Sequence, residues 1–460
     1  LKYDYLSKYI IEFSGRYDGN DNFHPDKRWG FFPAVSAVWM ISDENFMQKL
    51  NDKNILNSLK LRASYGETGI SDGVTRFGYM ALYNQGAMKE YYNAGNILNV
   101  TFSEGNLVNP LALTWYTRKS FNVGFDFASL NNRLEGSLDY FYYKTSGYLM
   151  SPNNIYATTL GKPLPEITSG SKHRRAGFEL NLRYKEKRGN WYYEIGGNIS
   201  YYNQLWEQLD SEDLATLKNP YTRQTHEKDY FYSMYLSDGL FQNKEQILNS
   251  PRPLPSTETS MGDIKYIDAN GDGKIDSNDM RRVGQPSMPH LNYGFDFRVE
   301  YKGWSLSALF QGTGDRYIAM GQQMQRGDYA SVITKFQADY WTPENTDARF
   351  PRVTKAGYPN GENNALVTDF FNMNAKYFRL KNLQISYNLK RDLLKNCNFI
   401  QGCRITLSGT NLFTVSDVLD FTDPEAKMIE PDKIEKNLRS ISGASYPVFR
   451  TYSLGLNVEF

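Results

Sequence analysis

Long apolar runs, a surplus of charge of one sign and catalytic signatures are all missing from these 460 residues. Lys and Arg number 52 and Asp and Glu number 51, so there is no basic surplus to bind DNA or RNA through counterion release. No apolar stretch reaches the roughly 18 residues of a transmembrane helix. If the chain lies in a membrane, it must therefore form a closed β-barrel, the other architecture that pairs every backbone group inside lipid.

Catalysis has little support in the sequence. The HExxH, GxSxG and P-loop motifs do not occur. The two cysteines, Cys397 and Cys403, lie close enough for a local disulfide in an oxidising periplasm, and the same spacing is compatible with two unpaired thiols. The four histidines are scattered without metal-ligand spacing, at His24, His173, His226 and His290. We therefore predict that the chain is not an enzyme.

Aromatic residues are plentiful. They make up 15% of the chain and include 35 tyrosines. A tyrosine has an apolar ring and a polar hydroxyl, so it suits a surface that is wet at one end and apolar at the other. Outer-membrane barrels carry girdles of such residues at both membrane interfaces. The composition therefore favours a membrane barrel over a soluble globular fold.

Alternation of apolar and polar residues is the dominant pattern. Leu134, Leu138 and Tyr140 fall on one side of an extended chain, whereas Glu135 and Asp139 fall on the other. Soluble β-sandwiches also alternate, but many of these segments are about twice as long as sandwich strands, and their polar sides carry the charges expected of a hydrated lumen. About thirteen strands are predicted, at residues 1–5, 9–18, 29–41, 57–67, 114–129, 133–149, 175–187, 191–204, 290–300, 304–311, 376–389, 404–413 and 447–460.

The connections between these strands alternate between short and long. The short series includes a small helix at 43–56 and the cysteine-bearing turn at 390–403. Outer-membrane barrels have short periplasmic turns and long extracellular loops, so we predict an all-β, transmembrane antiparallel barrel with its long loops outside the cell. Such barrels have an even strand count, and the odd count here predicts that residues 1–460 are the C-terminal part of a larger barrel. The long loops are 68–113, 150–174, 205–289, 312–375 and 414–446.

Several short segments follow one another along the whole chain. They include RWGFFP at 28–33, LKLRASYG at 59–66, SFNVGFD at 120–126, DGLFQN at 238–243, GDIKY at 262–266, FRLKNL at 378–383 and NLF at 411–413. No single segment is decisive, but the ordered set resembles the SusC/RagA family of TonB-dependent transporters.

This resemblance implies a 22-stranded barrel filled by an N-terminal plug, with the plug and the segment that contacts TonB lying outside residues 1–460. It also implies active import of oligosaccharides or peptides, energised through TonB, together with a surface lipoprotein of the SusD/RagB type that caps the barrel. A passive outer-membrane pore without a plug is the alternative function. An outer-membrane enzyme or adhesin that acts through its loops is a third class.

One loop has the spacing of a metal site. Within the large extracellular loop 205–289, residues 268–279 read DANGDGKIDSND, which is the ligand spacing of an EF-hand calcium loop. Asp occupies the last position, where Glu is usual, and the flanking residues read as extended chain. A structural Ca²⁺ is predicted here and is weighed against a solvated turn without metal. The predicted ligands are Asp268, Asn270, Asp272, Lys274 through its carbonyl, Asp276 and Asp279.

The last strand ends in an alternating apolar series. This series resembles the assembly signal that is read when a barrel is inserted into the outer membrane. An apolar strand that ends in Phe is weak evidence alone, but it agrees with the whole series of predicted strands. The predicted signal consists of Tyr452, Leu454, Leu456, Val458 and Phe460.

Aromatic residues in the predicted long loops are candidates for contact with the imported molecule. Their rings suit stacking on sugar rings or gripping peptide side chains. Packing within the loops or against the lipoprotein is the alternative, and it is the commoner role because aromatic side chains are mostly buried for their area. The candidates are Tyr91, Tyr92, Trp206, Tyr230, Tyr232, Tyr235 and Phe241.

Overall fold

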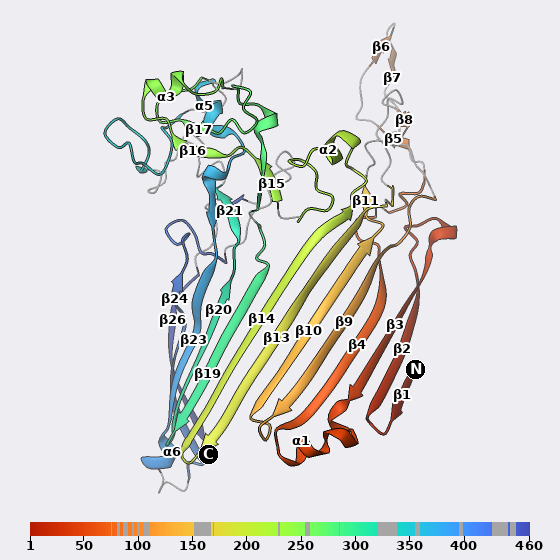
Figure 1. The fold of residues 1–460 in the computed structure, drawn as a ribbon, viewed down its shortest axis with the longest axis vertical. Coiled ribbons are helices and arrows are strands. Elements are labelled where there is room, and N and C mark those ends of the chain that lie inside the picture. The colour runs from red at the N-terminus through yellow and green to blue at the C-terminus, as the bar shows by residue number, and fades with distance from the viewer. Residues whose placement is uncertain are drawn as a thin grey trace. The chain divides into compact units, whose positions relative to one another are not determined.

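One sheet of 13 strands dominates the computed structural model (Figure 1), and we name it the wall sheet. Every neighbouring pair whose register is recorded within it is antiparallel. Its strands, in hydrogen-bonded order, are β1 (Lys2–Tyr5), β2 (Tyr9–Gly19), β3 (Trp29–Met40), β4 (Leu56–Ile70), β9 (Tyr116–Ser129), β10 (Leu134–Ser146), β13 (Lys172–Arg188), β14 (Trp191–Gln208), β19 (Leu291–Tyr301), β20 (Trp304–Thr313), β23 (Tyr377–Asn388), β24 (Gly402–Val415) and β26 (Thr451–Glu459).

The structure describes most of the chain, and it divides the chain into two compact units. The first unit contains residues 1–132, 137–178 and 202–229, and the second contains 133–136, 179–201 and 230–460. The described residues are 1–460 apart from 75, 81–82, 86–90, 94–95, 99–101, 105–110, 151–166, 169, 229–230, 254–257, 285, 321–337, 355–358, 395–398, 426–439 and 442–447.

The thirteen predicted strands are confirmed as the thirteen strands of the wall sheet. Their ends differ from the prediction, since β14 continues to Gln208 and β26 begins only at Thr451. Side-chain alternation fades near strand ends while backbone pairing continues, so the pattern locates the middle of a strand better than its limits. The small helix predicted at 43–56 is shorter, because only α1 (Gln48–Asp52) is helical after two 3-10 turns, η2 (Ile41–Asp43) and η3 (Asn45–Met47).

The cysteine-bearing turn begins with a short helix, α6 (Leu389–Asp392). Cys403 is buried in β24. Cys397 lies outside the described residues. Cys403 is a free thiol, in agreement with the alternative of two unpaired thiols.

The short turns of the wall sheet use left-handed backbone. Asn131 and Asn132, between β9 and β10, have φ values of 58° and 60°, and Gly189, between β13 and β14, has a φ of 61°. Asn tolerates this region better than other residues with a side chain, and Gly enters it without steric cost. Tight connections of this kind let consecutive strands pair directly.

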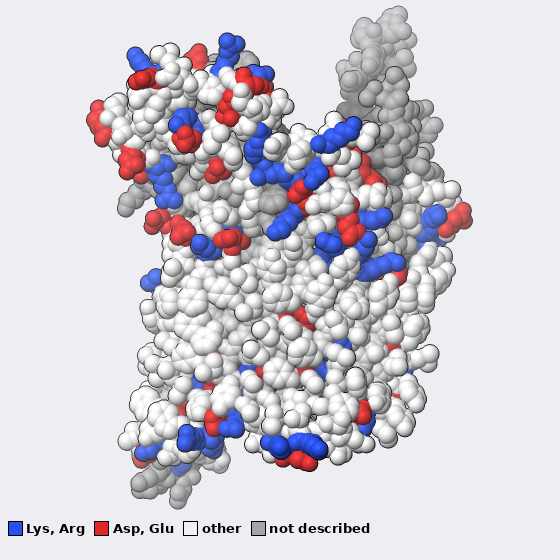
Figure 2. Space-filling view, viewed as in Figure 1, with Lys and Arg blue, Asp and Glu red and all other residues white. Residues whose placement is uncertain are grey.

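The two faces of the wall sheet differ in kind. Phe125 and Leu182 are exposed although they are large and apolar. Their chain neighbours Asp126 and Arg183 point to the other side, where they form ion pairs. On the side of the molecule drawn in Figure 2, charged residues gather toward the two ends of the strands and few lie over their middle. We name the apolar side the lipid face and the opposite side the lumen face.

Three of the long connections share one apolar core in the second unit, named the loop core here. Tyr266 comes from the β14–β19 connection, Trp341 and Phe371 from the β20–β23 connection, and Val418 from the segment after β24. The sequence shows these connections as separate loops, so their common packing was not predicted. The core members are Tyr235, Leu240, Ile264, Tyr266, Ile275, Ile318, Met320, Trp341, Phe350, Phe371, Met373, Ala375 and Val418.

Small sheets and short helices complete the connections. The paired strands are β5 (Tyr83–Gln85) with β8 (Phe102–Glu104), β6 (Tyr91–Asn93) with β7 (Asn96–Leu98), β11 (Leu149–Met150) with β12 (Ile167–Thr168), β15 (Phe231–Met234) with β18 (Arg281–Gly284), β16 (Ser237–Leu240) with β17 (Ile264–Tyr266), and β21 (Tyr317–Met320) with both β22 (Asn372–Asn374) and β25 (Ser440–Ile441). The helices are α2 (Leu214–Lys218), α3 (Lys244–Leu248) and α5 (Pro359–Glu362), and the 3-10 turns are η1 (Pro25–Lys27), η5 (Ser277–Asp279), η8 (Asn363–Ala365) and η9 (Asp369–Phe371). Among the described residues, no helix has the length and apolar character needed to cross a membrane.

Candidate functional site

Four ring-bearing side chains gather in the first unit where β9, β10, β13 and β14 meet the long connections. Tyr116 begins β9, Tyr148 follows β10, His173 is near the start of β13, and Trp206 is near the end of β14. The ring centroids of Trp206 and His173 are 4.9 Å apart, those of Trp206 and Tyr148 are 5.1 Å apart, and those of Tyr148 and Tyr116 are 5.6 Å apart. We name these four residues the aromatic cluster.

Strand alternation places the aromatic cluster on the lumen face. Tyr201 is exposed on the lipid face of β14, so Trp206, an odd number of residues further on, points to the opposite side. Phe178 and His173 are related in the same way on β13. Both rings are half-buried, which leaves part of each aromatic surface open. Such surfaces can stack on a sugar ring or pack against an apolar side chain of a peptide.

Only Trp206 of this cluster was nominated by the sequence. Tyr116, Tyr148 and His173 were missed because they are far apart in the chain and meet only through the pairing of four strands. A usable signal did exist. Each of them lies at or near the loop end of a predicted strand, and within their strands Tyr116 and His173 fall on the polar side of the alternation.

Ion pairs cover another part of the lumen face in the first unit. The Arg62 Nη2 atom is 2.7 Å from Asp126 Oδ1 and 2.9 Å from Asp139 Oδ2. Lys60 Nζ is 2.6 Å from Asp126 Oδ2. Two cations and two carboxylates balance here, so the wall is polar without a strong field of one sign. This part of the lumen face therefore offers polar groups with little net charge.

A buried polar link joins two connections within the loop core. Asp263 is fully buried and accepts hydrogen bonds from Arg352 Nη2 at 3.0 Å and from Asn364 Nδ2 at 2.8 Å. Asn364 Oδ1 in turn accepts from the Ile264 backbone N–H at 2.9 Å. Burial raises the pKa of Asp263 above its usual value, although Arg352 opposes the shift. The link therefore joins the 262–266 segment to the β20–β23 connection. Each buried polar group in it supplies the hydrogen-bond partner that the other would otherwise lack.

The predicted calcium loop, residues 268–279, curls around Asp268. Asp268 Oδ1 accepts a hydrogen bond from Gly271 N–H at 2.7 Å, and Asp268 Oδ2 accepts one from Gly273 N–H at 2.7 Å. The two glycines have φ values of 77° and 81°, which residues with a side chain rarely adopt. The hydrogen bond from Gly273 contributes most to lowering the pKa of Asp268, so this carboxylate is held anionic.

The other predicted ligands are engaged in contacts inside the loop. Asp279 is buried and accepts hydrogen bonds from the N–H groups of Ala269 at 3.0 Å and Asp276 at 2.8 Å. The Lys274 ammonium lies 2.9 Å from Asp276 Oδ2 and 3.7 Å from Asp272 Oδ2. Among the residues that the structure describes, no three His, Cys, Asp or Glu side chains are arranged to hold a metal. The loop has the sequence spacing and the glycine turns of a calcium loop, but its carboxylates now contact backbone N–H groups and the Lys274 ammonium, so calcium binding stays a prediction.

The remaining loop aromatics fall into two groups. Tyr235 is a buried member of the loop core, and Phe241 is buried as well. Both agree with the alternative that the loop aromatics pack within the loops. The side chains of Tyr91, Tyr92, Tyr230 and Tyr232 lie outside the described residues. Trp206 is therefore the one nominated aromatic whose described surroundings suit contact with a ligand.

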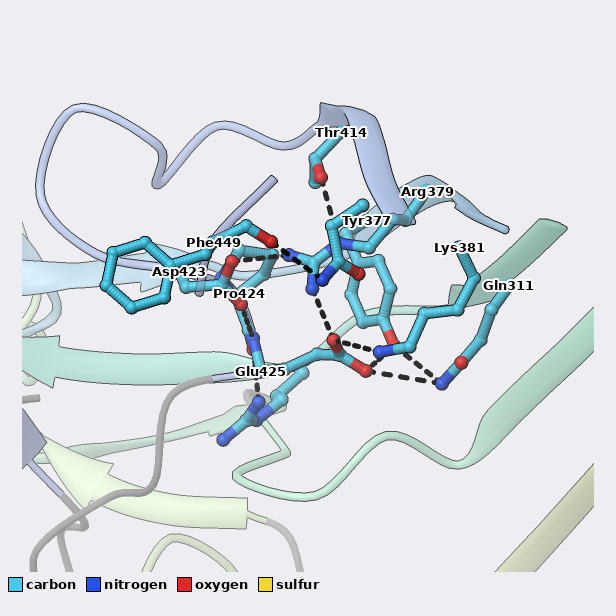
Figure 3. A network of polar contacts seen from close by, with 11 residues as sticks. Gln311, Tyr377, Arg379, Lys381, Thr414, Asp423, Pro424, Glu425 and Phe449 are labelled. Carbon is cyan, nitrogen blue, oxygen red and sulfur yellow. Dashed lines mark hydrogen bonds and ion pairs between the residues drawn. The ribbon is translucent and has the colours of Figure 1, made fainter. Parts of the chain in front are cut away.

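A buried arginine anchors the segment after β24 to the wall sheet. Figure 3 shows Arg379 of β23 between Asp423 and Glu425, with which it forms ion pairs. Its side chain is only 1% exposed, and its Nε donates to Thr414 Oγ1 at 2.8 Å. Burial acts to raise the pKa of Glu425, but hydrogen bonds from neighbours such as Lys381 outweigh it and leave the pKa below its usual value. The sequence contains this arginine in the FRLKNL segment, but no neighbouring residues predict that it pairs with Asp423 and Glu425.

Four residues of the predicted assembly series lie on β26, and Phe460 follows that strand directly. Leu454 and Leu456 are exposed and stand opposite Leu407 and Ile405 of β24. Tyr452 and Phe460 are also exposed, whereas Val458 is half-buried. The series therefore forms one apolar ribbon along the lipid face.

Comparison with known proteins agrees with this fold. Residues 1–412 match the family model described as TonB dependent receptor-like, beta-barrel. TonB-dependent receptor P3 of Formosa agariphila is 28% identical over all of this chain and 45% of its own length. TonB-dependent receptor SusC of Bacteroides thetaiotaomicron is 25% identical over all of this chain and 43% of its own length.

Solved structures show the same likeness in three dimensions. The RagAB peptide transporter matches all of this chain and 46% of its own chain with a TM-score of 0.71 and 21% identity. At that identity the match establishes the fold alone. The chain spans about half the length of the curated relatives and solved structures named here.

Proposed function

Because this chain belongs to the TonB-dependent receptor-like β-barrel family, we propose that it forms much of the wall of an importer that carries oligosaccharides or peptides across the bacterial outer membrane. The outer membrane is where this SusC/RagA-like barrel resides, and the family consists of transporters that are not enzymes, in agreement with the prediction from the sequence. Import would be energised through TonB by parts of the protein other than residues 1–460.

One observation carries the proposal. The wall sheet separates an exposed apolar face from a face of ion pairs, and on the ion-paired side the aromatic cluster stands where the strands meet the long connections. A cargo that enters past the loops would meet these rings at the wall. Aromatic rings can pack against many different sugar rings and peptide side chains, so these contacts favour binding of varied cargo over selection of a single one.

A surface lipoprotein is the proposed partner on the cell-surface side. The solved relative named above is the RagAB assembly, and the sequence resembles the family that pairs with lipoproteins of the SusD/RagB type. The loop core gives the long connections a packed body that such a lid can rest on. Co-purification of the tagged full-length protein with a lipoprotein tests this partnership.

We expect Trp206→Ala to reduce import. The change removes a ring whose centroid lies about 5 Å from those of His173 and Tyr148. Loss of one stacking contact typically costs about 1 kcal/mol, so uptake at low substrate concentration should fall by roughly fivefold while the protein level stays constant. Uptake of labelled oligosaccharides and labelled peptides by cells that carry each variant measures the effect. Trp191→Ala, at the turn end of the same strand, is the matched control and should leave uptake unchanged.

The same cells separate an importer from a passive pore. Import that needs TonB stops when the tonB gene is deleted or the proton gradient is collapsed. Entry through an open pore continues under both treatments. Uptake that persists without TonB contradicts the importer and favours the pore.

We propose further that loop 268–279 holds a structural Ca²⁺ in the native protein. Asp268, Asn270, Asp272 and Asp276 supply hard oxygen donors at the EF-hand spacing, and Ca²⁺ would displace the Lys274 ammonium from the two carboxylates beside it. The bound ion would close the loop against the loop core, which Ile275 already joins.

Calcium binding should appear both as metal content and as stability. Calcium a hundredfold above its dissociation constant should stabilise the loop region by about 2.7 kcal/mol, seen as slower proteolysis of that region. Asp268→Asn should abolish the effect, and Asp238→Asn, an exposed acidic residue outside the motif, should not. Protein dialysed against saturating Ca²⁺ that retains no metal and gains no protease resistance would contradict the site.

A further inference from the structure

A hollow of about 530 Å³ lies among cationic side chains in the first unit. Its lining includes Lys144 from β10, Lys172 and Arg174 from β13, and Leu205 and Glu207 from β14. All of these side chains are half-buried. We name this hollow the basic pocket.

Strand alternation places the basic pocket on the lipid face. Phe178 is exposed on the lipid face of β13, and Arg174 and Lys172 lie an even number of residues before it. Tyr140 is exposed on the lipid face of β10, and Lys144 shares its side for the same reason. The pocket therefore opens on the outside of the wall, opposite the aromatic cluster.

The charges that line the pocket do not cancel. Lys144 Nζ is 2.5 Å from the Glu207 carboxylate, which satisfies one cation. Within the described part of the chain, Lys172 and Arg174 form no direct ion pair, and Arg174 has a longer-range electrostatic interaction with Glu207, the carboxylate that Lys144 already contacts. Three cations around one carboxylate leave a net positive charge in the pocket, which an anion from outside would balance.

Acidic side chains near the pocket are committed elsewhere. Asp210 accepts hydrogen bonds from Gly170 N–H and from Gln208. Glu212 accepts from Thr225 N–H at 3.1 Å, and Asp213 caps α2 by accepting from the Thr216 N–H at 2.6 Å. These carboxylates hold the 209–225 segment together. Lys172 and Arg174 are therefore available to bind an anion from outside the protein.

The order of residues along β10 sets the level of the pocket in the membrane. On the lipid face Leu138 is followed by Tyr140, Tyr142 and then Lys144. Aromatic belts mark the boundary between lipid tails and headgroups, so a cation one step beyond them lies among the headgroups. Figure 2 agrees, because charged residues appear beyond the uncharged middle of the strands and at the end that carries the long connections.

We propose that the basic pocket binds the phosphorylated headgroup of a lipid in the outer leaflet. Lys172 and Arg174 would contact the phosphate, since Arg can bind it with two parallel hydrogen bonds and Lys as a point charge. The apolar surface that continues below the pocket, from Phe178 to Leu182, would lie along the acyl chains. A free phosphate would gain only the first of these contacts, so the geometry favours a lipid.

The test compares lipid binding by two matched pairs of substitutions in the purified full-length protein. K172Q/R174Q removes both unpaired cations of the pocket and keeps most of each side-chain stem. R175Q/K187Q removes the same number of charges, and Arg175 is the next residue on the same strand with its side chain on the lumen face. Native mass spectrometry in detergent measures the fraction of protein that binds three probes: monophosphorylated lipid A, its dephosphorylated form and inorganic phosphate.

We expect the wild type and R175Q/K187Q to bind phosphorylated lipid A equally, and K172Q/R174Q to bind it roughly 30-fold more weakly, as two cationic contacts near a membrane surface predict. Binding by the wild type should fall as salt rises, which provides a readout even if a variant is not inserted. Equal losses in both double variants, binding of the dephosphorylated lipid as strong as that of the phosphorylated one, or displacement of the lipid by an equal concentration of inorganic phosphate would each overturn the proposal.

Discussion

Arg379→Ala is expected to destabilise the protein by about 3 to 5 kcal/mol, the usual cost of removing one partner from a buried ion pair. Arg379 is 1% exposed and pairs with both Asp423 and Glu425. Without it, Asp423 loses its cation and Glu425 keeps only Lys381. Urea unfolding of the protein in detergent micelles or lipid vesicles, followed by tryptophan fluorescence, measures the change in the free energy of unfolding.

Two further variants separate the charge effect from lost packing. Lys381→Gln removes the more exposed cation near Glu425 and should cost at most about 1 kcal/mol. Adding Asp423→Asn to Arg379→Ala removes the carboxylate that has lost its cation, while Glu425 keeps Lys381, and it should recover part of the loss. If Arg379→Ala unfolds at the same urea concentration as Lys381→Gln, the anchoring role assigned to Arg379 is wrong.

Leu454→Arg is expected to block assembly of the barrel in the outer membrane. Leu454 is 75% exposed on the apolar ribbon of β26 and stands opposite Leu407. An arginine on the lipid face of a barrel costs about 2 to 4 kcal/mol near the membrane midplane. The amount of folded, heat-modifiable protein in isolated outer membranes measures assembly.

The matched substitution is Ser453→Arg on the same strand. Ser453 stands opposite Ser408 and its side chain lies on the other face, where charge is already common. It should therefore assemble at close to the wild-type level. Equal accumulation of both variants would show that the two faces do not differ as described, and it would also remove support for an assembly signal in this strand.

The wall strands were predictable because the face of a residue in a strand is a local property. Alternation such as that of Leu134, Glu135 and Leu138 repeats within each strand, so all thirteen strands could be located without knowing what they pair with. Strand ends were less accurate, as β14 and β26 show, because backbone pairing outlasts the side-chain pattern.

The candidate sites were predictable only in part. Trp206 could be nominated as a loop aromatic, but the aromatic cluster depends on the pairing of four strands, which no local pattern encodes. The partners of Arg379 lie about forty residues away along the chain. The calcium motif was visible because its donors are close in sequence, whereas the position of the Lys274 ammonium between two of those donors depends on side-chain conformation.

The shared loop core restricts how the long connections of this protein can change. Residues from three connections, such as Tyr266, Trp341 and Val418, lie in one core, and Asp263 depends on Arg352 and Asn364 from a different connection. A single connection transplanted from a relative would leave apolar side chains and a buried carboxylate without their counterparts. Chimeras designed to exchange cargo between relatives should therefore move all three connections as a set, and natural variants that differ in cargo are expected to differ in all three at once.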